Sequence, residues 1–236
     1  MYKKIGILGG MSPESTVLYY QHMVRRYEAT FGDVGYPEII IYSVSFQAFR
    51  NWMDQGDWNA IADGLIDGVR RLHLAGSDFA VMATNTMHIV FDKVQTSSPI
   101  PLLSIIDAVA ESIVKEGVET VGLLGTIFTM EKAFYIDALA KYGIKTLVPE
   151  RPEREYIQKI IRTQLTRGLT RPDTLARFQN IIEELTEKGA GGIILGCTEI
   201  PLLVSTENTN AKLFDSTRIH ADKALDFAIR DSVKDR

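Results

Sequence analysis

Two short polar segments, each following an apolar run, carry side chains that could do chemistry. Residues 84–86 (Thr-Asn-Thr) follow the run 79–83, and residues 197–199 (Cys-Thr-Glu) follow the run 193–195 and one glycine. An apolar run that stops at small polar residues is typical of the carboxyl end of a buried parallel strand. Ligands of open α/β sheets bind at this edge, where hydroxyl, amide and thiol groups can meet a small substrate.

The two polar segments belong to a longer internal repeat. Residues 6–10 (Gly-Ile-Leu-Gly-Gly) are echoed about 115 residues later by residues 122–126 (Gly-Leu-Leu-Gly-Thr), and residues 76–86 are echoed by residues 189–199. The repeat predicts a duplicated fold with a site between its halves.

Apolar periodicity alternates between strand-like and helix-like along the chain, which indicates βαβ units and a mostly parallel sheet in each half. Ser12, Pro13 and Glu14 predict the start of a helix, and Thr129 is expected to cap a later helix ahead of Glu131. Strands are expected at residues 5–8, 38–46, 79–83, 100–106, 121–124, 144–148, 192–197 and 212–214, and the clearest helices at residues 57–75, 108–116, 181–188 and 218–229.

The predicted fold class is therefore α/β, with two pseudo-symmetric halves, each a mostly parallel sheet flanked by helices, and a cleft between them. Loop-like composition near residues 99–101 and 205–210 sets the expected boundaries. We expect residues 1–100 plus 211–236 to form the first half and residues 101–210 the second.

Composition excludes several function classes. A net charge of −4 and a pI near 5.6 give no basic surface for nucleic acid or an anionic membrane. A single cysteine excludes an intrachain disulfide framework and a Cys-rich zinc site. The apolar run 5–8 is too short for a signal-peptide core, and no run approaches the length of a membrane span. A cytoplasmic protein without a bound metal is the expectation.

Four motifs in order along nearly the whole chain resemble the aspartate/glutamate racemase family, and in particular its branch of cofactor-independent amino-acid racemases. They are residues 9–12 (Gly-Gly-Met-Ser), residues 84–88 (Thr-Asn-Thr-Met-His), Gly125-Thr126 with Thr129, and residues 196–199 (Gly-Cys-Thr-Glu). The resemblance implies two α/β halves around a small amino-acid or carboxylate substrate, no cofactor, and a homodimer, for which the Tyr19-Tyr20 pair offers aromatic surface.

The resemblance also implies roles for single residues. One group removes the Cα proton and another returns it on the opposite face, which assigns these roles to Cys197 and Thr84. A thiolate base needs a lowered pKa, and the position of Cys197 between a strand and an expected helix start suits that. The implied substrate-binding residues are Met11, Ser12, Asn85, Thr86, Thr126, Thr129 and Thr198, and the implied supporting residues are His88, Glu199 and Tyr156.

The chain departs from the commoner family pattern at two positions. Thr84 stands where many members carry a first cysteine, and its hydroxyl, a far weaker acid than a thiol, needs His88 or a water as a relay. Tyr156 stands where relatives carry a lysine for the side-chain carboxylate, so a preference for aspartate or glutamate does not follow.

Ordinary structural roles compete with the catalytic ones. Residues 84–86 could simply cap a helix, Gly9-Gly10 could serve close packing, and His88 could be a structural residue rather than an acid. Two alternative functions remain open: a single-cysteine isomerase or decarboxylase of a small carboxylic acid, and a non-catalytic carboxylate-binding protein.

Overall fold

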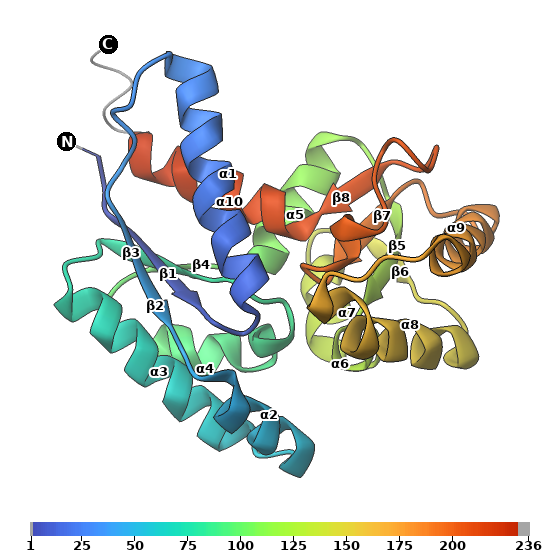
Figure 1. The fold of residues 1–236 in the computed structure, drawn as a ribbon, viewed down its shortest axis with the longest axis horizontal. Coiled ribbons are helices and arrows are strands. Elements are labelled where there is room, and N and C mark those ends of the chain that lie inside the picture. Colours follow the sequence, from blue (N-terminus) through green and yellow to red (C-terminus); the bar gives the residue numbers. More distant parts are fainter. Residues whose placement is uncertain (1, 231–236) are drawn as a thin grey trace. The chain divides into compact units, whose positions relative to one another are not determined.

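The computed structural model describes residues 2–230 and contains two separate four-stranded parallel sheets (Figure 1). The first has the strand order β2-β1-β3-β4 and the second the order β6-β5-β7-β8. Every strand pair in both sheets is parallel. Because β1 to β4 and β5 to β8 take the same order, the predicted α/β fold with two pseudo-symmetric halves is confirmed.

The strands are β1 (Ile5–Gly9), β2 (Ile39–Ser43), β3 (Phe79–Met82), β4 (Leu102–Leu103), β5 (Thr120–Gly125), β6 (Lys145–Leu147), β7 (Ile193–Gly196) and β8 (Leu213–Asp215). The α-helices are α1 (Pro13–Phe31), α2 (Phe46–Gln55), α3 (Trp58–Leu74), α4 (Phe91–Ser97), α5 (Ile105–Lys115), α6 (Ile127–Glu131), α7 (Ala133–Ala140), α8 (Arg151–Thr163), α9 (Pro172–Glu187) and α10 (Ser216–Ile229). Short 3₁₀ helices are η1 (Thr86–Val90), η2 (Leu165–Arg167) and η3 (Ile200–Leu202).

The chain divides into two compact units, one for each sheet. The first comprises Met1–Ile105 and Thr217–Arg236, as far as these are described, and the second comprises Ile106–Ser216. Each crossing lies a few residues after the boundary expected from the sequence. The reason is that β4 and β8, placed by that expectation in the opposite halves, complete the sheets of the first and second unit respectively.

Side chains of the first sheet alternate between two apolar layers, as the two-residue period of a strand requires. Ile5 and Ile7 of β1 face α1 and α10, together with Tyr19, Tyr27 and Leu225. Leu8 faces the layer built by α2, α3 and α4. In the second unit α8 and α9 pack against Leu124 and Leu195.

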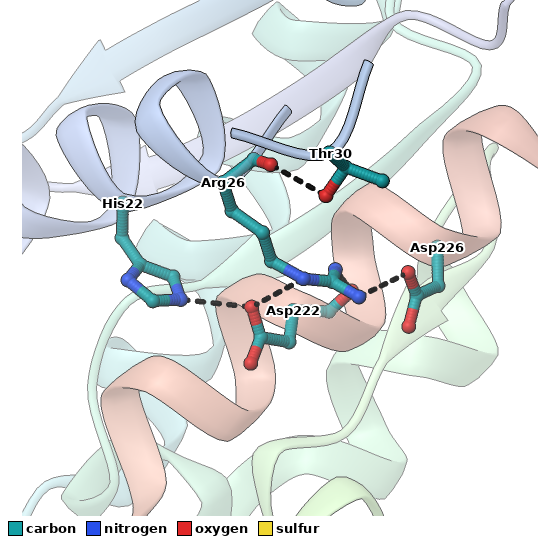
Figure 2. Close-up of polar contacts among 5 residues, drawn as sticks. All are labelled: His22, Arg26, Thr30, Asp222 and Asp226. Atoms are coloured by element: carbon teal, nitrogen blue, oxygen red, sulfur yellow. Dashed lines mark hydrogen bonds and ion pairs between the residues drawn. The ribbon is translucent and has the colours of Figure 1, made fainter. Parts of the chain in front are cut away.

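Helix α10, which follows the second crossing, docks on α1 through small side chains and an exposed ion-pair cluster (Figure 2). Asp222 accepts from His22 at 2.8 Å and lies 3.2 Å from the Arg26 Nε, while Asp226 pairs with another Arg26 nitrogen at 2.8 Å. Ala221, Ala224 and Ala228 face the shared core, at helical spacing. Because solvent screens the ion pairs, burial of the apolar face stabilises this contact more than the charges do.

Several local predictions are corrected by the structure. The expected strand 38–46 ends at Ser43, and its last residue Phe46 opens helix α2, which the sequence pattern did not predict. The cap of α6 is Thr126, whose hydroxyl accepts from the Thr129 N–H, whereas Thr129 lies inside the helix. The predicted cap Ser12 and first-turn Pro13 of α1 are confirmed.

Gly10 turns the chain from β1 into α1 in a conformation that other residues rarely adopt. Its φ is +87°, and a Cβ there would lie 2.4 Å from the Val44 carbonyl oxygen. Gly32, at the other end of α1, also has a positive φ of +71°, but a Cβ would meet nothing within 4 Å.

We therefore expect Gly10→Ala to lower the free energy of unfolding by about 3 kcal/mol or more, and Gly32→Ala by about 1 kcal/mol. The difference arises because only the first change adds a collision with backbone to the cost of the left-handed conformation. Urea unfolding of both variants measures it. Equal losses would contradict the steric role of Gly10.

Candidate active site

The first unit gathers predicted site residues at the carboxyl ends of β1 and β3. Leu8 pairs with Met82 in register, and the Ala83 N–H donates to the Leu8 carbonyl at 3.0 Å. Met11 and Ser12 follow β1, and residues 84–86 follow β3, all of them at least nine-tenths buried. Parallel pairing therefore brings these residues to one edge of the sheet.

The turn after β1 is closed by Thr16, a residue that sequence reasoning missed. Its hydroxyl accepts from the Gly10 N–H at 2.9 Å and donates to the Ser12 carbonyl at 3.0 Å. The Ser12 hydroxyl accepts from the Ser15 N–H at 3.4 Å as the helix cap. A Cβ on Gly9 would lie 2.4 Å from the Thr16 side chain, so close packing explains this glycine.

The second unit repeats the arrangement after β5 and β7. Gly125 pairs with Gly196 in register, so Thr126 and Cys197 directly follow a matched pair. Thr129 is fully buried, and a Cβ added to Gly196 would lie 3.3 Å from its side chain. Gln158 of α8, which no sequence signal singled out, accepts from the Ile127 N–H at 2.8 Å and so supports the start of α6.

Thr84 and Cys197 occupy equivalent places in the two units. Thr84 lies two residues after Met82, the register partner of Leu8, and Cys197 lies two residues after Leu195, the register partner of Leu124. Leu8 and Leu124 in turn both precede the closing glycine of their strand. Thr84 and Cys197 thus follow equivalent strands, β3 and β7, at the same position in the two sheets.

The Cys197 thiol has a buried carboxylate, Glu199, as its hydrogen-bond partner. The thiol donates to Glu199 Oε2 at 2.9 Å, and the Thr198 hydroxyl donates to the same oxygen at 2.9 Å. Burial first, and then the negative charge of Glu199, raises the pKa of the Cys197 thiol well above its ordinary value. The expectation of a lowered thiol pKa is therefore wrong, because burial and the facing Glu199 carboxylate together outweigh the backbone donors.

His88 lies beneath Thr84 but contacts its backbone rather than its hydroxyl. Nδ1 is 2.9 Å from the Thr84 carbonyl oxygen, and Nε2 accepts from the Ile105 N–H at 3.1 Å. Burial, and next the neighbouring His220, lowers the pKa of His88 to about 3. With both nitrogens engaged, His88 offers no acceptor to the Thr84 hydroxyl.

Tyr156 packs on α9. Arg177 lies over its ring at 3.8 Å from the centroid, and Phe178 lies 6.4 Å away. Its expected supporting role at the substrate stays a prediction.

Among the residues that the structure describes, no cluster of three or more histidine, cysteine, aspartate or glutamate side chains could hold a metal ion. Within the same residues, no helix is both long and apolar enough to cross a membrane.

The family model of Asp/Glu/hydantoin racemases matches residues 8–224. The chain belongs to this racemase family. It is 38% identical to an Asp/Glu racemase candidate from Yersinia pestis, with a TM-score of 0.90 and coverage of 96% of this chain and 99% of the other. An aspartate racemase homologue from Pyrococcus horikoshii OT3 is 40% identical, with a TM-score of 0.85 and the same coverage.

A broad specificity amino-acid racemase from Bacillus subtilis (strain 168) is 27% identical over 222 residues, which cover 90% of this chain and 92% of the relative. Family membership confirms the predicted enzyme class, an isomerase of the amino-acid racemase type, and leaves the substrate open.

The buried histidines of this racemase-family chain make its stability depend on pH. Burial lowers the pKa of His220 to about 4 and that of His88 to about 3, whereas an unfolded histidine titrates near 6.5. Below pH 6.5 the unfolded chain therefore binds more protons at these histidines than the folded one. Their contribution to the free energy of unfolding is complete above pH 6.5 and falls as the pH drops toward 4.

We expect each histidine to contribute a loss of about 1.4 kcal/mol per pH unit in that window. Urea unfolding at several pH values measures the slope of the free energy of unfolding against pH. In the double variant Tyr19→Phe/His220→Phe this slope should be smaller by about 1.4 kcal/mol per pH unit. His73→Gln, a change at an exposed histidine, is the control. An unchanged slope in the double variant would contradict a neutral His220.

Proposed function

We propose that this protein racemises or epimerises an amino acid without a cofactor, and that Cys197 and Thr84 transfer protons on opposite faces of the Cα atom. The observation that carries the proposal is the equivalent placement of these two side chains, each two residues beyond a matched register position. Inversion with two groups requires one proton-transfer group on each face of the Cα atom, and we assign one to each unit.

The substrate class is a small amino acid. Cα acidity is very low, so the carboxylate must receive many hydrogen bonds as charge moves onto it in the transition state. Strand-end hydroxyl, amide and backbone N–H groups are suited to that task. We assign substrate contact to Met11, Ser12, Asn85, Thr86, Thr126, Thr129 and Thr198.

Side-chain preference is proposed to be broad rather than restricted to acidic substrates. Tyr156 offers one hydroxyl and no fixed charge for a second carboxylate. The name of the Bacillus subtilis relative describes broad specificity, whereas the Pyrococcus horikoshii relative is named for aspartate.

Glu199 is proposed as the proton partner of Cys197. In one direction the thiol gives its proton to the planar, carbanion-like Cα, and the thiolate remains. In the other direction the thiol proton first passes along the 2.9 Å contact to Glu199 Oε2, and the thiolate then removes the Cα proton. A pair of this kind reconciles a raised thiol pKa with proton abstraction.

The two faces are proposed to be unequal. Thr84 carries a hydroxyl, and His88 has both ring nitrogens engaged elsewhere, so a relay from Thr84 must run through a water or a substrate group. Proton exchange on the Cys197 face is therefore expected to outpace exchange on the Thr84 face.

A homodimer through α1 is part of the proposal. Tyr20 is 39% exposed and Val17 is 50% exposed on this helix, at a spacing of three residues. Tyr19 is fully buried against His220 and is not available for such contact. The cytoplasmic location expected from the sequence stays a prediction.

Incubation of single enantiomers in heavy water, followed by chiral analysis, tests the function. A racemase gives the mirror isomer with deuterium at Cα, with a chelator present and no pyridoxal phosphate added. Loss of carbon dioxide from a small carboxylic acid would instead identify a decarboxylase. Binding without exchange, for every amino acid of a panel, would leave a carboxylate-binding protein.

Cys197→Ala is expected to lower both exchange and racemisation by about 1,000-fold, because it removes the group that transfers the proton to and from Cα on that face. Thr84→Ala should lower inversion by about 100-fold yet leave exchange of the enantiomer that the Cys197 face serves. Thr84→Cys should racemise at least as fast as the natural protein. Cys197→Ser controls for side-chain volume. Full activity of Cys197→Ala would refute the assignment.

Tyr20→Glu should convert the dimer to a monomer at micromolar concentration, because it places a charge in an apolar contact. Leu74→Glu, at a residue that is 84% exposed outside α1, should leave the dimer intact. Sedimentation velocity distinguishes the species. A natural protein that is monomeric under these conditions excludes the proposed assembly.

A further inference from the structure

Two buried histidines that take no part in the proposed proton transfer lie where the chain passes between its units. His88 is in η1, just beyond β3, and is 4% exposed, and His220 is in α10 and is fully buried. Their ring centroids are 6.3 Å apart, edge to face. The Phe91 ring stacks on His88 with its centroid 5.1 Å away.

Hydrogen bonds fix the proton of His88. The Ile105 backbone N–H can only donate, so Nε2, 3.1 Å away, is the acceptor. In a neutral ring Nδ1 then carries the hydrogen and donates to the Thr84 carbonyl at 2.9 Å. His88 thus connects the backbone of Thr84 to the first turn of α5.

His220 holds the opposite tautomer. The Leu103 carbonyl can only accept, so Nε2, 2.9 Å away, carries the hydrogen. Nδ1 accepts from the Tyr19 hydroxyl at 2.7 Å. Two ionisable side chains contact the His220 ring in the described part of the chain: Tyr19 of α1 through its hydroxyl, and His88 of η1 edge to face.

The two histidines bind opposite ends of the segment 103–105: His220 donates to the Leu103 carbonyl, and His88 accepts from the Ile105 N–H. The first unit ends at Ile105, and the chain returns to it at Thr217, three residues before His220. The two covalent crossings are therefore joined to each other through His220 and to the Thr84 strand end through His88. We call Tyr19, His220 and His88 the histidine clamp.

We propose that His88 and His220 are positioning residues, which hold Thr84 at the carboxyl end of β3 in fixed relation to both chain crossings. The proposal rests on the racemase function proposed above. Proton transfer needs its donor and acceptor held to within about an ångström, and a displacement of Thr84 impairs one face of the reaction only. The clamp stabilises that geometry without touching the substrate.

Nitrogen NMR of the imidazoles tests the clamp independently of activity. Of the four histidines in the chain, His22 and His73 are replaced by glutamine, so that the remaining signals belong to His88 and His220. Between pH 6 and 8 we expect one neutral ring protonated at Nδ1 and one protonated at Nε2. A charged ring, or two rings of the same tautomer, overturns the proposal.

Backbone exchange gives a second measurement that does not require turnover. The Ile105 amide should exchange with solvent at least about 10-fold faster in His220→Phe than in the natural protein, because loss of the Leu103 contact loosens the segment that His88 holds. Tyr27→Phe is the matched control, since Tyr27 is also a fully buried tyrosine of α1, with its hydroxyl 3.1 Å from that of Tyr2. Equal exchange in His220→Phe and Tyr27→Phe overturns the proposal.

Activity then shows what the clamp positions. In Tyr19→Phe and His220→Phe we expect racemisation to fall by about 10-fold relative to deuterium exchange of the enantiomer that the Cys197 face serves, with an unchanged ratio in Tyr27→Phe. A general loss of stability would lower both rates together, and that outcome overturns the positioning role. If the natural protein shows no racemisation at all, the proposed function fails, while NMR and amide exchange still decide the clamp.

Discussion

In-register pairing of the central strands is the constraint on which the rest of the structure depends. β1 with β3, and β5 with β7, are buried parallel pairs whose polar backbone groups must be satisfied within the sheet. A polar side chain buried inside such a strand would lose its hydrogen bonds to water, so the polar residues lie at the first positions beyond the strands. The register of Leu8 with Met82, and of Leu124 with Leu195, decides where these positions lie.

Close packing at the strand ends follows from the same pairing. A Cβ on Gly125 would lie 2.9 Å from the Gly196 carbonyl oxygen, and one on Gly9 would strike Thr16. Because these glycines have no side chain, hydroxyl-bearing residues can approach the backbone and accept hydrogen bonds from its N–H groups, as Thr16 does for Gly10. The glycines therefore allow the hydroxyl-bearing residues to pack closely at the strand ends.

Burial also sets the electrostatics of the two units differently. The Cys197 thiol is buried and faces the Glu199 carboxylate, which accepts its hydrogen bond, and both effects raise the thiol pKa. Thr84 faces a neutral histidine that is already engaged on both sides, so its hydroxyl has no equivalent partner there. A duplicated backbone thus carries chemically unequal ends, and the inequality comes from neighbouring side chains rather than from topology.

The sequence by itself determined the α/β class, the duplicated sheets and the strand-end positions of Thr84 and Cys197, because alternating apolar runs and glycine-polar steps are local signals. It also indicated the cap at Ser12. Tertiary structure alone decided that α6 is capped at Thr126, that the pKa of the Cys197 thiol is raised, and that His88 binds backbone. Three of the four hydrogen bonds given above for the two histidines join residues 17, 117 and 201 positions apart, and no local pattern records which distant group a buried nitrogen meets. Protonation states depend on those distant partners and on burial, so they emerge only when the chain is folded.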